Sequence, residues 1–183
     1  NNLDEFFRVR VATLNKMAKL GKASKVHLEA NPEGILREIQ QTVIMLQNDF
    51  DNTYQQIIRE LADQNIFIKN ETQLSPKQET FIRQYYTDKV SSQIVPLMIE
   101  SIPQMPLLRD KSIYLACVLR NKKNRRSSSY ALIEIPTKVL PRFIILPAEK
   151  DETDIILLED IIRFNLPNLF APFGFDDFSG YII

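Results

Sequence analysis

The sequence contains no tryptophan, one cysteine, one histidine and four glycines among 183 residues. A single cysteine cannot form an internal disulfide, and these counts cannot supply a zinc site built from several Cys and His ligands. The glycines lie at positions 21, 34, 174 and 180, so the glycine-rich dinucleotide loop and the P-loop are both excluded. No apolar run approaches the roughly 18 residues that a membrane-spanning helix needs.

The sequence contains few residues suited to nucleophilic or metal-assisted catalysis. The histidine, His27, falls in the basic segment 21–30, which is typical of a surface loop. Cys117 lies inside the apolar run 113–119, where a buried structural thiol is favoured over a reactive one. The carboxylate pairs at positions 4–5 and 176–177 do not supply the several convergent oxygens that hard cations require. We therefore expect no catalytic residue and no metal ligand in this chain.

The formal net charge is zero, but the charges are segregated along the chain. Basic side chains dominate residues 105–145, whereas acidic side chains dominate residues 146–183. Two interpretations stay open: the two segments pack on each other, or the basic one forms a patch for an anionic ligand. The densest basic run is Arg120, Lys122, Lys123, Arg125 and Arg126. It is either a solvated hairpin tip or a footprint for a polyanion, and no aromatic residue interleaves it, so reading of nucleic-acid sequence is unsupported.

One long amphipathic helix is predicted from Asn31 to about Asn65. The side-chain oxygen of Asn31 can cap its first turn, and Pro32 suits the first helical position because the missing N–H is not needed there. Such a helix is about 45 to 50 Å long, so its apolar stripe needs a partner along its whole length. The stripe consists of Ile35, Ile39, Val43, Leu46, Phe50, Tyr54, Ile57, Ile58 and Leu61.

A shorter amphipathic helix is predicted from Leu3 to Leu20. Asn2 is its expected N-cap, Glu5 stands where a capping box places a glutamate, and Gly21 is placed to end the helix. The chain begins without an initiator Met, directly on a helix cap, and we expect a fragment of a larger protein. The predicted buried face consists of Leu3, Phe7, Val11, Leu14 and Ala18.

The remainder of the chain changes from helical to alternating periodicity. A third helix is expected from Pro76, with Ser75 as N-cap and Gln78 completing a capping box. Strands are expected at 66–68, 112–119, 128–135, 142–146 and 181–183, with a last helix over 154–166 and a turn-rich loop over 173–180. The predicted fold class is α+β: an N-terminal helical domain, residues 1–65, followed by a head domain, residues 66–183, with a small, mainly antiparallel sheet.

The opening residues, NNLDEFFRVRV at 1–11, closely resemble the N-terminal domain motif of bacterial polyphosphate kinases of the first family. Four later segments are similar to the same family in order and spacing: IFI at 66–68, QLS at 73–75, YALIEIP at 130–136 and LPRF at 140–143. They resemble the later N-terminal region and the middle, or head, domain. The resemblance therefore spans essentially the whole chain.

The resemblance implies an enzyme that reversibly transfers the terminal phosphoryl group of ATP to polyphosphate, through a phosphohistidine and with Mg²⁺. It places the nucleophilic histidine, the metal site and most phosphate contacts in C-terminal catalytic domains beyond Ile183, so this fragment alone is expected to be inactive. Asn2 matches the asparagine that contacts the adenine nucleotide in the family. Arg8 and Arg10 are candidate phosphate contacts, and the basic run described above is a candidate polyphosphate contact.

The expected partners are ATP or ADP, inorganic polyphosphate and further copies of the full protein, with no nucleic acid and no transmembrane segment. The expected location is the cytoplasm, with attachment to the periphery of the inner membrane as a second option. An alternative of a different class is a non-catalytic dimerisation or assembly module with a basic loop that contacts polyanions. A long exposed stripe on the Asn31 helix would support that alternative.

Overall fold

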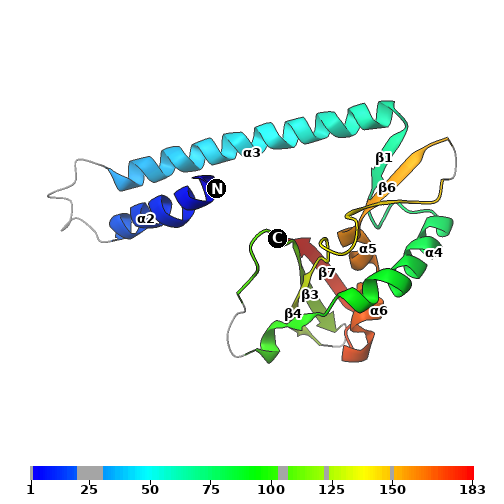
Figure 1. The fold of residues 1–183 in the computed structure, drawn as a ribbon. Coiled ribbons are helices and arrows are strands. Elements are labelled where there is room, and N and C mark those ends of the chain that lie inside the picture. Colours follow the sequence, from blue (N-terminus) through cyan, green and yellow to red (C-terminus); the bar gives the residue numbers. More distant parts are fainter. Residues whose placement is uncertain (1, 20–30, 103–106, 122–123, 149–150) are drawn as a thin grey trace. The chain divides into compact units, whose positions relative to one another are not determined.

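The computed structural model describes residues 2–19, 31–102, 107–121, 124–148 and 151–183. They form two compact units, Asn1–Arg59 and Glu60–Ile183 (Figure 1). The first unit is helical, and the second combines short helices with strands that are mainly antiparallel. The predicted class, α+β with an N-terminal helical region, is confirmed.

The first unit contains two helical runs. One consists of α1 (Asn2–Glu5), the π-helical segment η1 (Phe6–Val11) and α2 (Ala12–Lys19), and the other is α3 (Pro32–Asp63). The backbone N–H of Gly34 donates to the side-chain oxygen of Asn31 at 3.2 Å. The long helix and its Asn31 cap are thus confirmed.

Two details of the N-terminal helix differ from the prediction. Helix α1 begins at Asn2, so Asn2 lies in the first turn and is not the N-cap. The π-helical segment puts more residues into each turn, which rotates the apolar face relative to an ideal α-helix. Leu3 is 65% and Phe7 40% exposed, whereas Phe6 is half-buried.

The apolar stripe of α3 is partly exposed: four of its nine residues are exposed and the other five are half-buried. Within this helix the only buried residue is Pro32. Phe50 is 70% exposed and Leu46 57%, and Tyr54 and Ile57 are also exposed. A stripe of this kind normally stabilises a helix by packing against another element, and the described residues cover this one only in part.

The second unit contains two sheets where the sequence indicated one. The smaller sheet has the order β1 (Ile66–Lys69), β6 (Thr153–Leu157) and β5 (Phe143–Ile145), with β1 and β6 parallel. The larger, antiparallel sheet has the order β2 (Leu97–Met98), β4 (Asn124–Glu134), β3 (Tyr114–Asn121) and β7 (Asp177–Ile182). Each sheet therefore combines strands from the beginning and from the end of the unit: β1 lies beside β6, and β7 lies beside β3.

Short helices pack around these sheets. The elements are α4 (Pro76–Tyr85), η3 (Tyr86–Val90), η4 (Ser91–Gln93), η5 (Ile99–Ser101), α5 (Leu158–Phe164), α6 (Leu166–Phe170) and η6 (Ala171–Phe173). Helix α4 starts as predicted, because Ser75 and Gln78 form a reciprocal capping box and Pro76 occupies the first turn. The start of this helix is therefore encoded locally.

The predicted helix over 154–166 is wrong in its first turn. Residues Thr153–Leu157 form strand β6, in which Asp154 and Ile156 are buried, and the helix begins only at Leu158. Helix α5 ends at Phe164, and Pro167 occupies the first turn of α6, where its missing N–H is tolerated. Strand β7 begins at Asp177, inside the segment predicted as a loop.

The core of the second unit lies between the larger sheet and the helices. Alternate residues of β3, namely Leu115, Cys117 and Leu119, point into it and are at most 1% exposed. The predicted burial of Cys117 is confirmed. The fully buried helical residues of this core are Ile82 from α4, Val90 from η3, Leu158, Ile161 and Ile162 from α5, and Leu166 and Phe170 from α6.

A buried carboxylate, Asp154 on β6, joins three elements that are distant in sequence. Its Oδ2 accepts hydrogen bonds from Lys69 Nζ on β1 and from Gln78 Nε2 on α4, both at 2.6 Å. Asp154 is 2% exposed and Gln78 is fully buried. The Oε1 atom of Gln78 also accepts from the backbone N–H of Ser75 at 3.2 Å, so the same side chain closes the capping box.

Asp154→Ala is expected to destabilise the protein by about 3 kcal/mol, because it leaves a buried amide and a part-buried ammonium without their acceptor. The free energy of unfolding is measured by urea denaturation. The control, Asp151→Ala at an exposed nearby position, should change it by no more than about 0.5 kcal/mol. Equal losses in the two variants would contradict the role assigned to Asp154.

Candidate functional site

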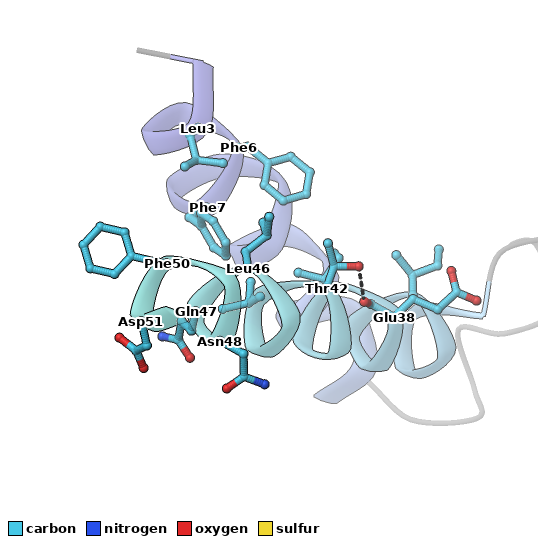
Figure 2. A pocket seen from close by; sticks show the side chains of 13 residues that line it. Leu3, Phe6, Phe7, Glu38, Thr42, Leu46, Gln47, Asn48, Phe50 and Asp51 are labelled. Atoms are coloured by element: carbon cyan, nitrogen blue, oxygen red, sulfur yellow. Dashed lines mark hydrogen bonds between the residues drawn. The ribbon is translucent and has the colours of Figure 1, made fainter. Parts of the chain in front are cut away.

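A large apolar groove lies in the first unit beside the start of the chain. Its volume is about 850 Å³. Leu3, Phe6 and Phe7 from the N-terminal run face Leu46 and Phe50 of α3 (Figure 2). Its polar lining residues are Glu38, Thr42, Gln47, Asn48 and Asp51. The groove therefore suits an apolar or aromatic group, and its lining residues offer no cation to a phosphate.

Asn2, the candidate nucleotide contact, is exposed and immediately precedes the first lining residue, Leu3. A carboxamide presents both donors and an acceptor, which suits the edge of a purine. The neighbouring rings of Phe6 and Phe7 meet edge to face, with centroids 5.4 Å apart. The sequence thus puts a polar amide next to an aromatic surface, although Asn2 itself does not line the groove.

The candidate phosphate contacts Arg8 and Arg10 are not gathered around that groove. Arg8 Nε lies 3.0 Å from Asp4 Oδ1, one helical turn earlier, with both side chains more than half exposed. Exposed pairs of this kind contribute little to stability. Arg10 borders a separate apolar groove of about 470 Å³ together with Val9 and Thr13.

The basic run divides between the strands of the β3–β4 hairpin. Arg120 lies near the end of β3, and its Nη1 is 3.9 Å from Asp177 Oδ2 on β7. Arg125 and Arg126 belong to β4 by their backbone. Lys122 and Lys123 lie outside the described residues, as does His27. The hairpin location of the run is therefore supported, but no common binding surface is defined.

The remaining reactive groups do not form a catalytic site. Burial raises the pKa of Cys117 to about 12, and the nearby positive charge of Arg163 only partly offsets this. A thiol with such a pKa is a poor nucleophile near neutral pH. Over the described ranges, no three His, Cys, Asp or Glu side chains converge in a way that could hold a metal ion.

Among the described residues, no helix combines the length and the apolar character needed to cross a bilayer.

A charged cluster that the sequence did not reveal surrounds Arg163 in the last turn of α5. Arg163 pairs with Asp160 on the same helix, its Nη1 lies 3.1 Å from Glu71 Oε2, and its Nε donates to the carbonyl of Gly180 at 3.2 Å. The three-residue spacing of Asp160 and Arg163 was a visible signal. No local pattern in the sequence indicated the contact between Arg163 and Glu71, because the two residues are 92 positions apart.

Asp160 titrates abnormally in this cluster. Burial raises the pKa of its carboxyl from 3.8 to about 6, the charge of Arg163 opposes this shift, and the charges of Glu71 and Glu159 reinforce it. Glu159 is itself paired with Arg142, whose Nε lies 3.0 Å from Glu159 Oε1. The cluster links α5 to the loop after β1 and to strand β7, and nothing about it indicates a reacting group.

Two domains of one protein family match this chain, one after the other. The polyphosphate kinase N-terminal domain matches residues 1–69, and the polyphosphate kinase middle domain matches residues 77–183. The chain belongs to the polyphosphate kinase family. The resemblance found in the opening motif and in the later segments is thereby confirmed over both units.

Relatives agree with this assignment. A polyphosphate kinase of Vibrio parahaemolyticus is 38% identical over 185 residues, covering 99% of this chain and 26% of that protein. The polyphosphate kinase of Escherichia coli K12 is 33% identical, covering 98% and 25%. The crystal structure of polyphosphate kinase from Porphyromonas gingivalis matches with a TM-score of 0.77 and 27% identity, covering 99% and 26%. The chain spans about a quarter of the length of these relatives.

The raised pKa of Asp160 predicts a specific pH dependence. The folded protein binds this proton more tightly than the unfolded chain, so the carboxyl is neutral below about pH 4 and destabilises the fold once charged above about pH 6. The difference in unfolding free energy, wild type minus Asp160→Asn, should therefore decrease as pH rises from 4 to 6. Urea denaturation at several pH values measures it, with Asp151→Asn as the control. Identical pH profiles for the two variants would contradict the assignment.

Proposed function

We propose that the protein containing this chain is an ATP:polyphosphate phosphotransferase, to which this chain contributes the N-terminal and head domains, divided near residue 65. The observation that supports this most directly is the match of two family domains, in order, to residues 1–69 and 77–183. The relatives that cover almost the whole chain carry the name polyphosphate kinase.

The proposed reaction proceeds in two reversible displacements. A histidine nitrogen outside this chain attacks the terminal phosphorus of ATP, the bond to the bridging oxygen breaks, and ADP leaves with that oxygen. The terminal oxygen of polyphosphate then attacks the phosphohistidine, which restores the histidine and lengthens the chain by one phosphate. Mg²⁺ is proposed to assist from ligands outside this chain, and we place the enzyme in the cytoplasm.

Within this scheme the present chain contributes binding, not bond making. Asn2 is proposed to hydrogen-bond the adenine edge, and its exposed position beside an aromatic surface is compatible with that role. Arg8 and Arg10 are proposed to add positive charge near the phosphates. The side chain of Arg8 is more than half exposed and pairs with Asp4 one helical turn earlier, so it is accessible to a ligand.

Asn2→Ala in the intact parent enzyme is expected to raise the KM for ATP about tenfold, which corresponds to one lost hydrogen-bonding group of about 1.4 kcal/mol. ATP-dependent polyphosphate synthesis is measured beside the control Asn15→Ala, which removes the same side chain from an exposed position on α2. An unchanged KM for Asn2→Ala would remove the nucleotide role. An inactive but folded parent would remove the kinase assignment itself.

A second candidate function is assembly, and the exposed stripe of α3 specifically favours it. Leu46, Phe50, Tyr54 and Ile57 follow at helical spacing and are each at least 44% exposed. Exposed apolar surface of this extent is characteristic of interaction sites. The proposed occupant is a second copy of the protein, because a helical stripe pairs readily with its own equivalent across a two-fold axis. In this alternative the basic hairpin serves to contact polyanions.

The assembly candidate is tested in the parent protein with Tyr54→Ser combined with Ile57→Ser. If the stripe forms the contact, the dimer dissociation constant measured by sedimentation should rise at least tenfold, a loss of about 1.4 kcal/mol. The matched control is Asn52→Ser combined with Gln55→Ser on the exposed polar face of the same helix. An unchanged constant in the stripe variant would exclude this surface from self-association.

A further inference from the structure

A second pocket, in the head unit, has a polar character that the apolar groove lacks. It has a volume of about 280 Å³ and lies where β3 begins, β4 ends and the chain turns after Ile135. Six polar residues line it: Gln93, Arg109, Ser112, Glu134, Thr137 and Lys138. None of them belongs to the candidate sites discussed above.

The backbone around this pocket is held by hydrogen bonds. The N–H of Arg109 donates to the Tyr114 hydroxyl at 2.9 Å, and the N–H of Ile135 donates to the carbonyl of Ile113 at 2.9 Å. After β4, the N–H groups of Val139 and Leu140 both donate to the carbonyl of Pro136. The segments that carry the polar side chains are therefore fixed before any ligand arrives.

The charges of the pocket are only partly satisfied by one another. Glu134 Oε1 accepts from Ser112 Oγ at 3.0 Å, whereas its Oε2 lies 3.6 Å from Arg109 Nη1. The latter distance is too long for a direct hydrogen bond. Lys138 is exposed and forms no ion pair with another residue in the part of the chain that the structure describes. The pocket thus offers two cations and one carboxylate that retains acceptor capacity.

We propose that this pocket binds a protonated phosphoryl group, either free hydrogen phosphate or the terminal phosphate of a phosphate chain. Arg109 and Lys138 neutralise the anionic oxygens through charge-assisted hydrogen bonds. Glu134 accepts the remaining P–OH proton, which a fully deprotonated anion does not have. The small volume, just below the usual range for ligand pockets, suits one small anion and not a whole nucleotide.

The carboxylate makes this site selective for one class of anion. Near neutral pH inorganic phosphate and terminal phosphoryl groups exchange a proton with a pKa in the region of 6 to 7, whereas sulfate carries no proton. Sulfate would bring an unprotonated oxygen against Glu134, and two such charges repel. The inference goes beyond the proposed phosphotransferase activity, because it concerns binding by the head unit itself and can fail while that activity stands.

The test titrates the chain with sodium phosphate, sodium sulfate and tripolyphosphate at pH 6.5 and constant ionic strength, followed by calorimetry and by NMR shifts of residues around the pocket. The wild type is expected to bind phosphate at least tenfold more tightly than sulfate. Lys138→Ala should weaken phosphate binding at least fivefold, and Glu134→Gln should bring the phosphate-to-sulfate affinity ratio close to one. Binding of orthophosphate or tripolyphosphate that is tighter than binding of sulfate supports the proposal. The tighter of the two phosphate ligands then shows whether the pocket prefers a free ion or a chain end.

The control is Lys16→Ala, which removes the same charge from an exposed position on α2 of the first unit that does not line the pocket. It should leave phosphate affinity unchanged. Two results would overturn the proposal: equal wild-type affinities for phosphate and sulfate, or equal losses in Lys16→Ala and Lys138→Ala, since either would reduce the effect to general attraction of anions. Because Lys138 is exposed, its replacement keeps the fold, and far-UV circular dichroism verifies this for each variant.

Discussion

The hydrogen-bonded carboxylate of Asp154 is the interaction on which the arrangement of the head unit depends most. It holds Lys69 of β1 and Gln78 of α4, which precede it by 85 and 76 residues. Burying a carboxylate is costly unless it is paired and hydrogen-bonded. Its other oxygen, Oδ1, has no hydrogen-bond partner among the described residues. The two hydrogen bonds to Oδ2 therefore offset the cost of burying this carboxylate. Strand β6 is thereby fixed beside β1, and α5, which follows β6 directly, is directed into the core.

The two units obtain their stability in different ways. The head unit buries an apolar cluster drawn from α4, β3, β4, α5 and α6, and each fully buried aliphatic side chain contributes about 1.5 to 3 kcal/mol. The first unit buries a single residue of its long helix, and Leu46, Phe50, Tyr54 and Ile57 of the apolar stripe of that helix remain exposed. Helices in proteins derive most of their stability from packing of an apolar face. The exposed stripe is therefore the structural basis for the assembly candidate.

Residue types suited to catalysis and residue types suited to ligand recognition occupy different environments in this chain. Cys117 is buried with a pKa raised to about 12, and the described carboxylates do not converge on a metal, so the groups suited to catalysis are sequestered or dispersed. The groups suited to recognition are exposed: Asn2 beside the aromatic groove, and Lys138 with Arg109 around the polar pocket. Such a chain fits the N-terminal and middle regions of a family whose members are about four times its length.

The sequence alone determined the features that depend on neighbouring residues: the long helix with its Asn31 cap, the capping box of Ser75 and Gln78, the β3 and β4 strands and the burial of Cys117. These follow from periodicity and capping, which act within a few residues.

Tertiary structure decided the rest. Residues 153–157 form a strand because they pair with Ile66–Lys69, and the contacts of Arg163 with Glu71 and of Asp154 with Gln78 join residues 76 to 92 positions apart. The polar pocket around Glu134 likewise exists only once β3, β4 and the following turn are assembled, because no local pattern encodes which distant side chains will meet.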